Sequence, residues 1–97
     1  MRTFEKSAGI VERKVRDTHI LVPLEGSGTA VIDSLYTLNE TAGFIWCRAV
    51  AGAAEPAIAD EVSATFDVER TRARTDVRTI LNDLVRIGAL REKRRSP

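Results

Sequence analysis

Residues 35–46, which read LYTLNETAGFIW, mark the point at which the sequence changes from strand to helix. Apolar residues recur with a period of two before Asn39 and at helical spacing after it. Asn39 is a strong N-cap residue, because its side-chain oxygen can accept a hydrogen bond from a free amide of the first turn. We therefore expect a strand to end at Leu38 and a helix to begin directly after Asn39.

Three short strands are expected before this junction. They occupy residues 10–15, 19–24 and 29–38, and each is a short run that includes β-branched or other apolar residues. Tight connections between such strands favour an antiparallel meander. Residues 1–9 are mostly polar and are expected to form a flexible arm.

Three helices are expected after the junction. The first ends at Gly52, the second begins near Pro56, and the third lies between residues 67–69 and Gly88. Residues 92–97 are expected to form a basic tail. Three strands followed by three helices predict an α+β protein with a small winged-helix-like domain.

Length and composition describe one small globular domain. The chain has 97 residues, of which 43% are hydrophobic and 30% are charged, so it is rich enough in apolar residues to fold. Its longest apolar run, residues 20–24, is far too short to span a membrane. No secretory signal is visible, and the expected location is the cytoplasm.

Nothing in the sequence predicts catalysis. The single cysteine, Cys47, and the single histidine, His19, fall in different predicted elements. A reactive thiol needs a partner that lowers its pKa, so Cys47 is interpreted as structural and His19 as a surface imidazole. One cysteine also excludes an internal disulfide and a cysteine-based zinc cluster within one chain. We expect no catalytic residue, no metal and no cofactor.

Basic residues are concentrated at the C-terminal end of the chain. Residues 1–68 carry six basic and ten acidic residues, whereas residues 69–97 carry nine basic and four acidic ones. A third helix rich in arginine favours a winged-helix DNA-binding protein as one alternative. These arginines would form a basic ridge along the helix. Asp76 and Asp83 interrupt this ridge, however, and the net charge of +1 is low for binding to phosphates. The arginines concerned are Arg70, Arg72, Arg74, Arg78 and Arg86.

A peptide-binding groove is another alternative. The outer strand of a small meander has unpaired amides and carbonyls, and such an edge accepts an extended peptide as an added strand. Residues 29–36 would form this edge, and the third helix would face it. The same edge can instead be covered by the N-terminal arm or by a second copy of the chain, and the pattern alone does not separate these cases.

The order of several motifs resembles one family. Residues 35–46 are similar to the central motif of the coenzyme PQQ synthesis protein D (PqqD) family, in which a strand ending in Leu-Asn-Glu passes into a helix with an Ile-Trp pair. The similarity continues through residues 59–62, 66–68 and 88–90, and it extends over residues 10–91. Loop residues 25–30 are rich in Gly and Ser, and the spacing of residues 31–36 looks more like that of divergent members. The precursor can therefore lead to PQQ or to another modified peptide.

The resemblance implies a non-enzymatic precursor-recognition element. Such proteins capture the leader of a ribosomally made precursor peptide by strand addition and present it to a radical S-adenosylmethionine maturase. The implied strand contacts are Val31, Ile32, Asp33, Ser34 and Leu35, and the implied helix contacts are Val77, Ile80, Leu81 and Leu84. The residues closest to the family motif are interpreted as structural; they are Leu38, Asn39, Ile45 and Trp46.

Two further partners are considered. Arg70, Arg74 and Arg78 would suit an acidic leader or an acidic surface of the partner enzyme, an interpretation that depends on charge alone. A second copy of the chain would make a homodimer. Nucleic acid and membrane are not expected partners.

Overall fold

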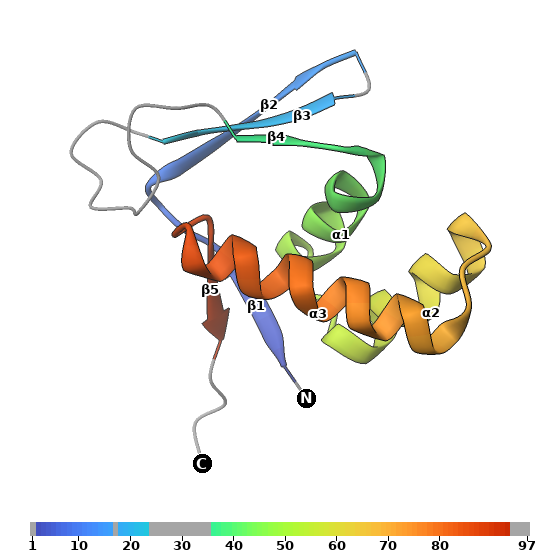
Figure 1. The fold of residues 1–97 in the computed structure, drawn as a ribbon. Helices are drawn as coiled ribbons and strands as arrows, with labels where there is room; N and C mark the ends of the chain where they lie inside the picture. The colour runs from blue at the N-terminus through green and yellow to red at the C-terminus, as the bar shows by residue number, and fades with distance from the viewer. Residues whose placement is uncertain (1, 17, 24–35, 94–97) are drawn as a thin grey trace.

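Strands change to helices at the expected junction in the computed structural model, which describes residues 2–16, 18–23 and 36–93. The three-stranded antiparallel sheet followed by three helices is confirmed, and a two-stranded sheet is added to it (Figure 1). Along the chain the elements are β1 (Thr3–Lys6), β2 (Ile10–Val15), β3 (Thr18–Pro23), β4 (Tyr36–Leu38), α1 (Glu40–Val50), α2 (Glu55–Phe66), α3 (Arg70–Arg86) and β5 (Leu90–Lys93).

The larger sheet has the strand order β2-β3-β4, and both pairings are antiparallel. The first predicted strand coincides with β2, and the second is confirmed as far as Pro23. The third is confirmed over Tyr36–Leu38, while its residues 29–35 lie outside the described residues. β4 therefore stands at one edge of the sheet and leads directly into α1.

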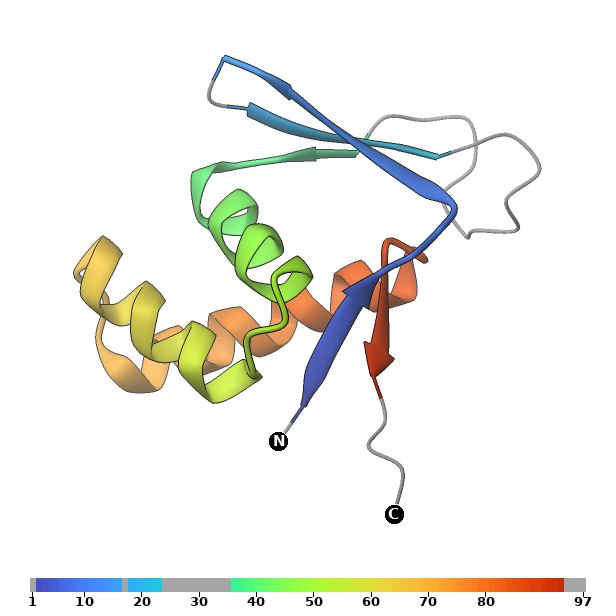
Figure 2. The ribbon, with the colours of Figure 1, turned by 180° about the vertical axis from the view of Figure 1, so that it is seen from behind.

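The expectation of a flexible N-terminal arm over residues 1–9 is wrong for residues 3–6, which form β1. This strand pairs with β5, with Phe4 opposite Glu92 and Lys6 opposite Leu90 (Figure 2). Phe4 is only 2% exposed, so its burial draws the strand onto the core. The predicted basic tail is likewise corrected at residues 92 and 93, which belong to β5.

Helix boundaries follow the local signals of the sequence. The amide of Ala42 donates a hydrogen bond of 2.8 Å to Asn39 Oδ1, which caps α1 as expected. Gly52 and Gly88 follow the ends of α1 and α3 with φ of +97° and +84°. This left-handed conformation favours glycine, because a Cβ would clash with the backbone. The structure thus confirms these boundaries.

Loss of the Asn39 cap is expected to destabilise the protein. Asn39→Ala should lower the free energy of unfolding by about 1 kcal/mol, because an amide of the first turn loses its partner. Asn39→Ser is the matched control, since serine also caps helices, and it should stay close to the wild type. Urea denaturation followed by circular dichroism measures both, and equal stability of Asn39→Ala and the wild type would contradict the prediction.

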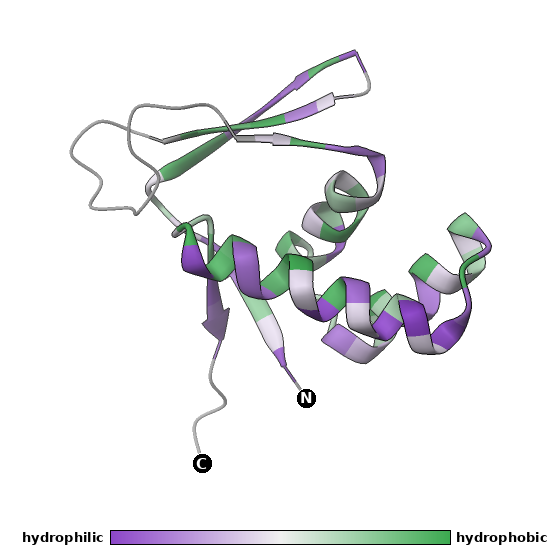
Figure 3. Cartoon of the chain, viewed as in Figure 1, coloured by the Kyte–Doolittle hydropathy of each residue, from purple (hydrophilic) through white to green (hydrophobic). Residues whose placement is uncertain are grey.

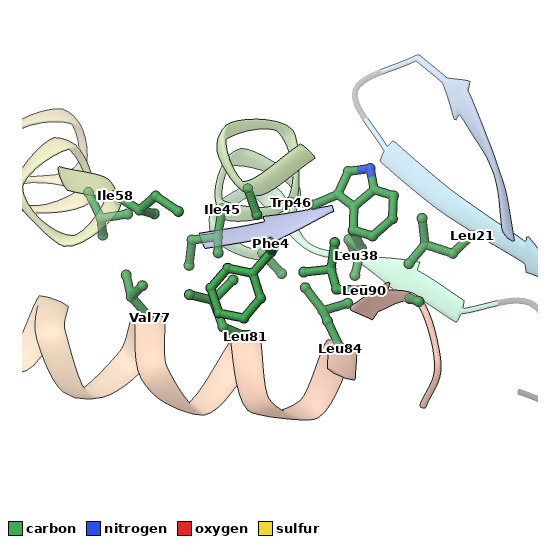
Figure 4. Packing of buried hydrophobic residues seen from close by; sticks show 14 of the residues in the cluster. Phe4, Leu21, Leu38, Ile45, Trp46, Ile58, Val77, Leu81, Leu84 and Leu90 are labelled. Carbon is green, nitrogen blue, oxygen red and sulfur yellow. The ribbon is translucent and has the colours of Figure 1, made fainter. Parts of the chain in front are cut away.

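One hydrophobic core joins the two sheets to the three helices (Figure 4). Apolar residues alternate with hydrophilic ones along α3, as expected for a helix with one face against the core (Figure 3). No helix within the described ranges is both long enough and apolar enough to cross a bilayer. The buried residues include Phe4, Leu21, Leu38, Ile45, Trp46, Ile58, Val77, Leu81, Leu84 and Leu90.

Candidate functional site

β4 offers an open backbone edge. It pairs with β3 on one side only, through His19 with Leu38 and Ile20 with Thr37, and it has no second partner among the described strands. Leu38 is 3% exposed and points into the core, whereas the next residue back, Thr37, is exposed. An edge strand of this kind presents amides and carbonyls that can pair with another chain.

The strand contacts implied by the family resemblance precede this edge in the sequence. They are Val31, Ile32, Asp33, Ser34 and Leu35, and all five lie outside the described residues. The structure consequently describes only the last three residues of the predicted strand, Tyr36–Leu38.

The helix contacts implied by the resemblance divide into two groups. Val77, Leu81 and Leu84 are at most 1% exposed and fill the core (Figure 4). Ile80 is half-buried and packs against the same core from its margin. Of the four, Ile80 is therefore the residue whose side chain is not fully buried in the core.

The arginine ridge on α3 is partly engaged in ion pairs. Arg78 Nε lies 3.2 Å from Glu55 Oε2, and Arg70 Nε lies 3.7 Å from Asp60 Oδ1. Glu55 is buried at 8% exposure and also lies 3.0 Å from Arg2 Nη1, so the pairs with Arg2 and Arg78 together offset the cost of burying a carboxylate. Arg74 is exposed and makes no ion pair within the part of the chain that the structure describes.

A cluster that the sequence did not predict lies between the β2–β3 hairpin and α1. His19 Nδ1 is 2.6 Å from Glu12 Oε2, and His19 Nε2 is 3.9 Å from Cys47 Sγ. The interpretation of His19 as a surface imidazole is therefore corrected, because its side chain is only 15% exposed and lies between Glu12 and Cys47. Their sequence positions hide the contact, because each of the three side chains comes from a different element.

The strand register provides the signal that could have revealed half of this cluster. His19 pairs with Lys14, so Glu12 is its diagonal neighbour on the same face of the hairpin. Leu21 also belongs to this face and is fully buried, which turns the face toward α1. The packing of α1 against the hairpin then places Cys47 beside the imidazole.

The environment of Cys47 holds its thiol in the protonated form. Burial raises the pKa of Cys47, and the negative charge of Glu12 raises it further, whereas Lys14 and Arg48 act in the opposite direction. Because the thiolate is the nucleophile, a raised pKa disfavours nucleophilic catalysis by Cys47 at neutral pH.

Cys47 is expected to be alkylated slowly by iodoacetamide at pH 7. The raised pKa lowers the thiolate fraction there, so the rate should increase as the pH rises through that pKa. Mass spectrometry over time measures the rate, and the same chain unfolded in urea is the matched control. A folded chain that reacts faster than the unfolded one at pH 7 would contradict the prediction and indicate an activated thiol.

Comparison with known proteins gives a family and a fold. The sequence pattern of the family described as coenzyme PQQ synthesis protein D (PqqD) matches residues 18–90. No match was found among proteins of curated function. The structure is similar to that of "Lasso peptide synthetase B1 complexed with the leader peptide", with a TM-score of 0.78 and 22% identity over 91% of this chain and 96% of that one.

A second solved structure has the same fold. "TbiB1 in Complex with the TbiA(beta) Leader Peptide" has a TM-score of 0.75 and 22% identity, and the match covers 89% of this chain and 93% of that one. At this identity the likeness establishes the fold. Both of these related structures were solved with a leader peptide bound.

Proposed function

The chain belongs to the coenzyme PQQ synthesis protein D family, and from this premise we propose that it captures the leader of a precursor peptide and delivers it to the enzyme that modifies the precursor. The observation that carries the proposal is the family match over residues 18–90. The fold shared with two proteins solved with leader peptides supports it.

The proposed mode of capture is strand addition at the edge of the larger sheet. The open side of β4 supplies backbone donors and acceptors, and these fix the register of an extended peptide. We propose that residues 31–35, which precede β4 in the sequence, supply the remaining strand contacts to the leader. Ile80 on α3 supplies an apolar contact that selects among leader side chains, while the three buried helix residues keep α3 in place.

The recipient of the leader is proposed to be a radical S-adenosylmethionine enzyme that acts in PQQ synthesis or in the synthesis of a related modified peptide. The chain itself contributes binding and no chemistry, in keeping with the raised pKa of Cys47. Because ordering a flexible leader costs entropy, affinity should be modest for the area that is buried. Copurification of the chain with a candidate radical S-adenosylmethionine enzyme tests this assignment, and loss of modified product without the chain would support it.

A titration with labelled peptide tests leader capture. The probe is a fluorescent synthetic peptide with the sequence of a candidate leader, and a scrambled peptide of equal composition is the control. We expect saturable anisotropy for the leader and none for the scrambled peptide. Equal binding of the two peptides would contradict the proposal, as would a stable homodimer, seen by light scattering, that does not dissociate when the leader is added.

The winged-helix DNA-binding alternative is not favoured. Arg70 and Arg78 point to carboxylates of the same chain, which reduces the charge they can offer to phosphates. Titration of the protein with duplex DNA at two salt concentrations measures its affinity for DNA, which is compared with its affinity for the leader. Affinity for DNA above that for the leader, with a steep salt dependence, would restore this alternative.

Arg74 is expected to attract an acidic leader or an acidic surface of the partner enzyme. Arg74→Glu should weaken that binding by about 2–5-fold, because exposed ion pairs contribute about 0.2–1 kcal/mol each. It is a cleaner test than Arg78→Glu, which would place a second carboxylate beside the buried Glu55. If Arg74→Glu binds both the leader and the partner enzyme in low salt with the affinity of the wild type, the arginine ridge on α3 is not a binding surface.

A further inference from the structure

The side chains of Glu12, His19 and Cys47 bring three groups that can ligate or support a metal ion close together. One donor atom from each side chain lies within 4.8 Å of the other two. Glu12 lies on β2, His19 on β3 and Cys47 on α1, so the sheet positions the first two side chains and the helix positions the third. Imidazole and thiolate are ligands of borderline-soft ions such as Zn²⁺.

Glu12 determines which nitrogen of His19 is available. His19 Nδ1 and Glu12 Oε2 lie 2.6 Å apart, and in the tautomer that carries its proton on Nδ1 this nitrogen donates to the carboxylate. The neutral imidazole then has its lone pair on Nε2, the atom that faces Cys47 Sγ. A carboxylate behind a ligating histidine is a common second-shell arrangement, which orients the ring and raises its basicity.

The gap between Nε2 and Sγ is of the right size for one ion. Zinc bonds of about 2.3 Å to sulfur and about 2.0 Å to nitrogen span the observed 3.9 Å at an S–Zn–N angle of roughly 130°. A closing of the gap by a few tenths of an ångström would make the angle tetrahedral. The exposed thiol of Cys47 can make this adjustment by rotation about its side chain.

Gly43 holds the imidazole close to α1. A Cβ at this position would lie 2.6 Å from His19 Cδ2, which is closer than real Cβ contacts allow. Gly43 precedes Cys47 by four residues, so both lie on the same face of α1. The absence of a side chain at Gly43 therefore lets the ring rest beside the thiol.

Space remains for the other ligands of an ion. A cavity of about 500 Å³ opens beside the pair, and its walls include His19, Glu40, Phe44, Cys47 and Phe66. Lys14 and Arg48 also border this cavity and act on the thiol by charge. Water, or a side chain of a bound partner, can complete the coordination from this side.

We propose that His19 Nε2 and Cys47 Sγ bind a zinc-class divalent ion, with Glu12 as the residue that positions the imidazole. Binding forms one metal–nitrogen and one metal–sulfur bond, and the thiol releases its proton to solvent. The two remaining positions of a tetrahedral ion face the cavity. The site lies on the hairpin side of α1 and does not depend on leader capture at β4.

Cobalt titration of the untagged protein tests this site, because a thiolate bound to Co²⁺ gives an absorption band of its own. We expect a saturable band that Zn²⁺ abolishes. Cys47→Ser should remove the band, and His19→Gln should remove saturable binding. Glu12→Gln should keep the band but weaken binding by about 10–100-fold, as is usual when an outer-shell partner is lost.

Glu40→Gln is the matched control, since it removes a carboxylate that lines the same cavity without contacting the imidazole, and it should bind Co²⁺ as the wild type does. Circular dichroism checks that each variant folds. Absence of the band at a large molar excess of Co²⁺ would overturn the site. Binding that survives Cys47→Ser unchanged would place the metal elsewhere and also overturn it. Leader affinity is measured in metal-free buffer, so it reports on the proposed function separately.

Discussion

Trp46→Ala is expected to lower the free energy of unfolding by about 3–5 kcal/mol, the usual cost of removing a large aromatic side chain from a core. Trp46 is fully buried and belongs to the same core cluster as Leu21 and Leu38 (Figure 4). A small domain has only about 5–15 kcal/mol of stability in total. The variant should therefore unfold at a much lower urea concentration than the wild type.

Trp46→Phe separates the loss of volume from the loss of the indole N–H. The indole nitrogen is buried and has no hydrogen-bond partner within residues 2–16, 18–23 and 36–93. Phenylalanine keeps most of the apolar volume and removes this donor, so it should cost less than half as much as alanine. Equal destabilisation by alanine and phenylalanine would contradict the expected role of Trp46 as a volume-filling core residue.

Ile80→Asp is expected to weaken leader binding by about 10–100-fold, which corresponds to about 1.4–2.8 kcal/mol. Ile80 is half-buried at the margin of the core, on the helix that we propose contacts the leader. A carboxylate at this position would be desolvated against an apolar side chain of the leader. Fluorescence anisotropy with the labelled leader measures the loss.

Thr79→Asp is the matched control for this substitution. Thr79 is exposed and precedes Ile80 on the same helix. Thr79→Asp therefore adds the same negative charge to α3, but away from the margin of the core. Thermal unfolding must show that Ile80→Asp is folded, because a charge near a small core can destabilise it. If folded Ile80→Asp binds the leader as the wild type does, or if Thr79→Asp weakens binding equally, Ile80 is not a leader contact.

The junction at Asn39 shows how much of the fold is written in local sequence. A change of period, an N-cap and a glycine after each of two helices are local signals, and the structure confirms the elements that they predict. These signals suffice because each boundary depends on hydrogen bonds between neighbouring residues.

Contacts between distant residues could not be predicted in this way. β1 has one large apolar residue, Phe4, and its partner β5 lies at the other end of the chain. Local composition therefore favoured an arm, whereas the packing of Phe4 and the pairing with β5 make it a strand. Glu12 and Cys47 meet at His19 for the same reason, since that contact requires both the hairpin register and the position of α1.

For the candidate binding site, the sequence could predict which strand and helix are involved, but not which of their side chains are accessible. Helical spacing places four apolar residues near one another, but it does not show which of their side chains are buried in the core. They are Val77, Ile80, Leu81 and Leu84. The structure assigns Val77, Leu81 and Leu84 to the core and leaves Ile80 at its margin. This division depends on the depth of α3 in the fold, which periodicity does not contain.

The most direct test of leader capture by strand addition is an NMR titration of the isotope-labelled protein with the synthetic leader. We expect saturable shifts of amide signals from residues 31–38 and from the neighbourhood of Ile80, with those of Cys47 and its neighbours on α1 unchanged. New protection of β4 amides from hydrogen exchange should accompany them. Saturable shifts that leave residues 31–38 and Ile80 untouched would contradict strand addition, and an unchanged spectrum with the cognate leader would contradict leader capture itself.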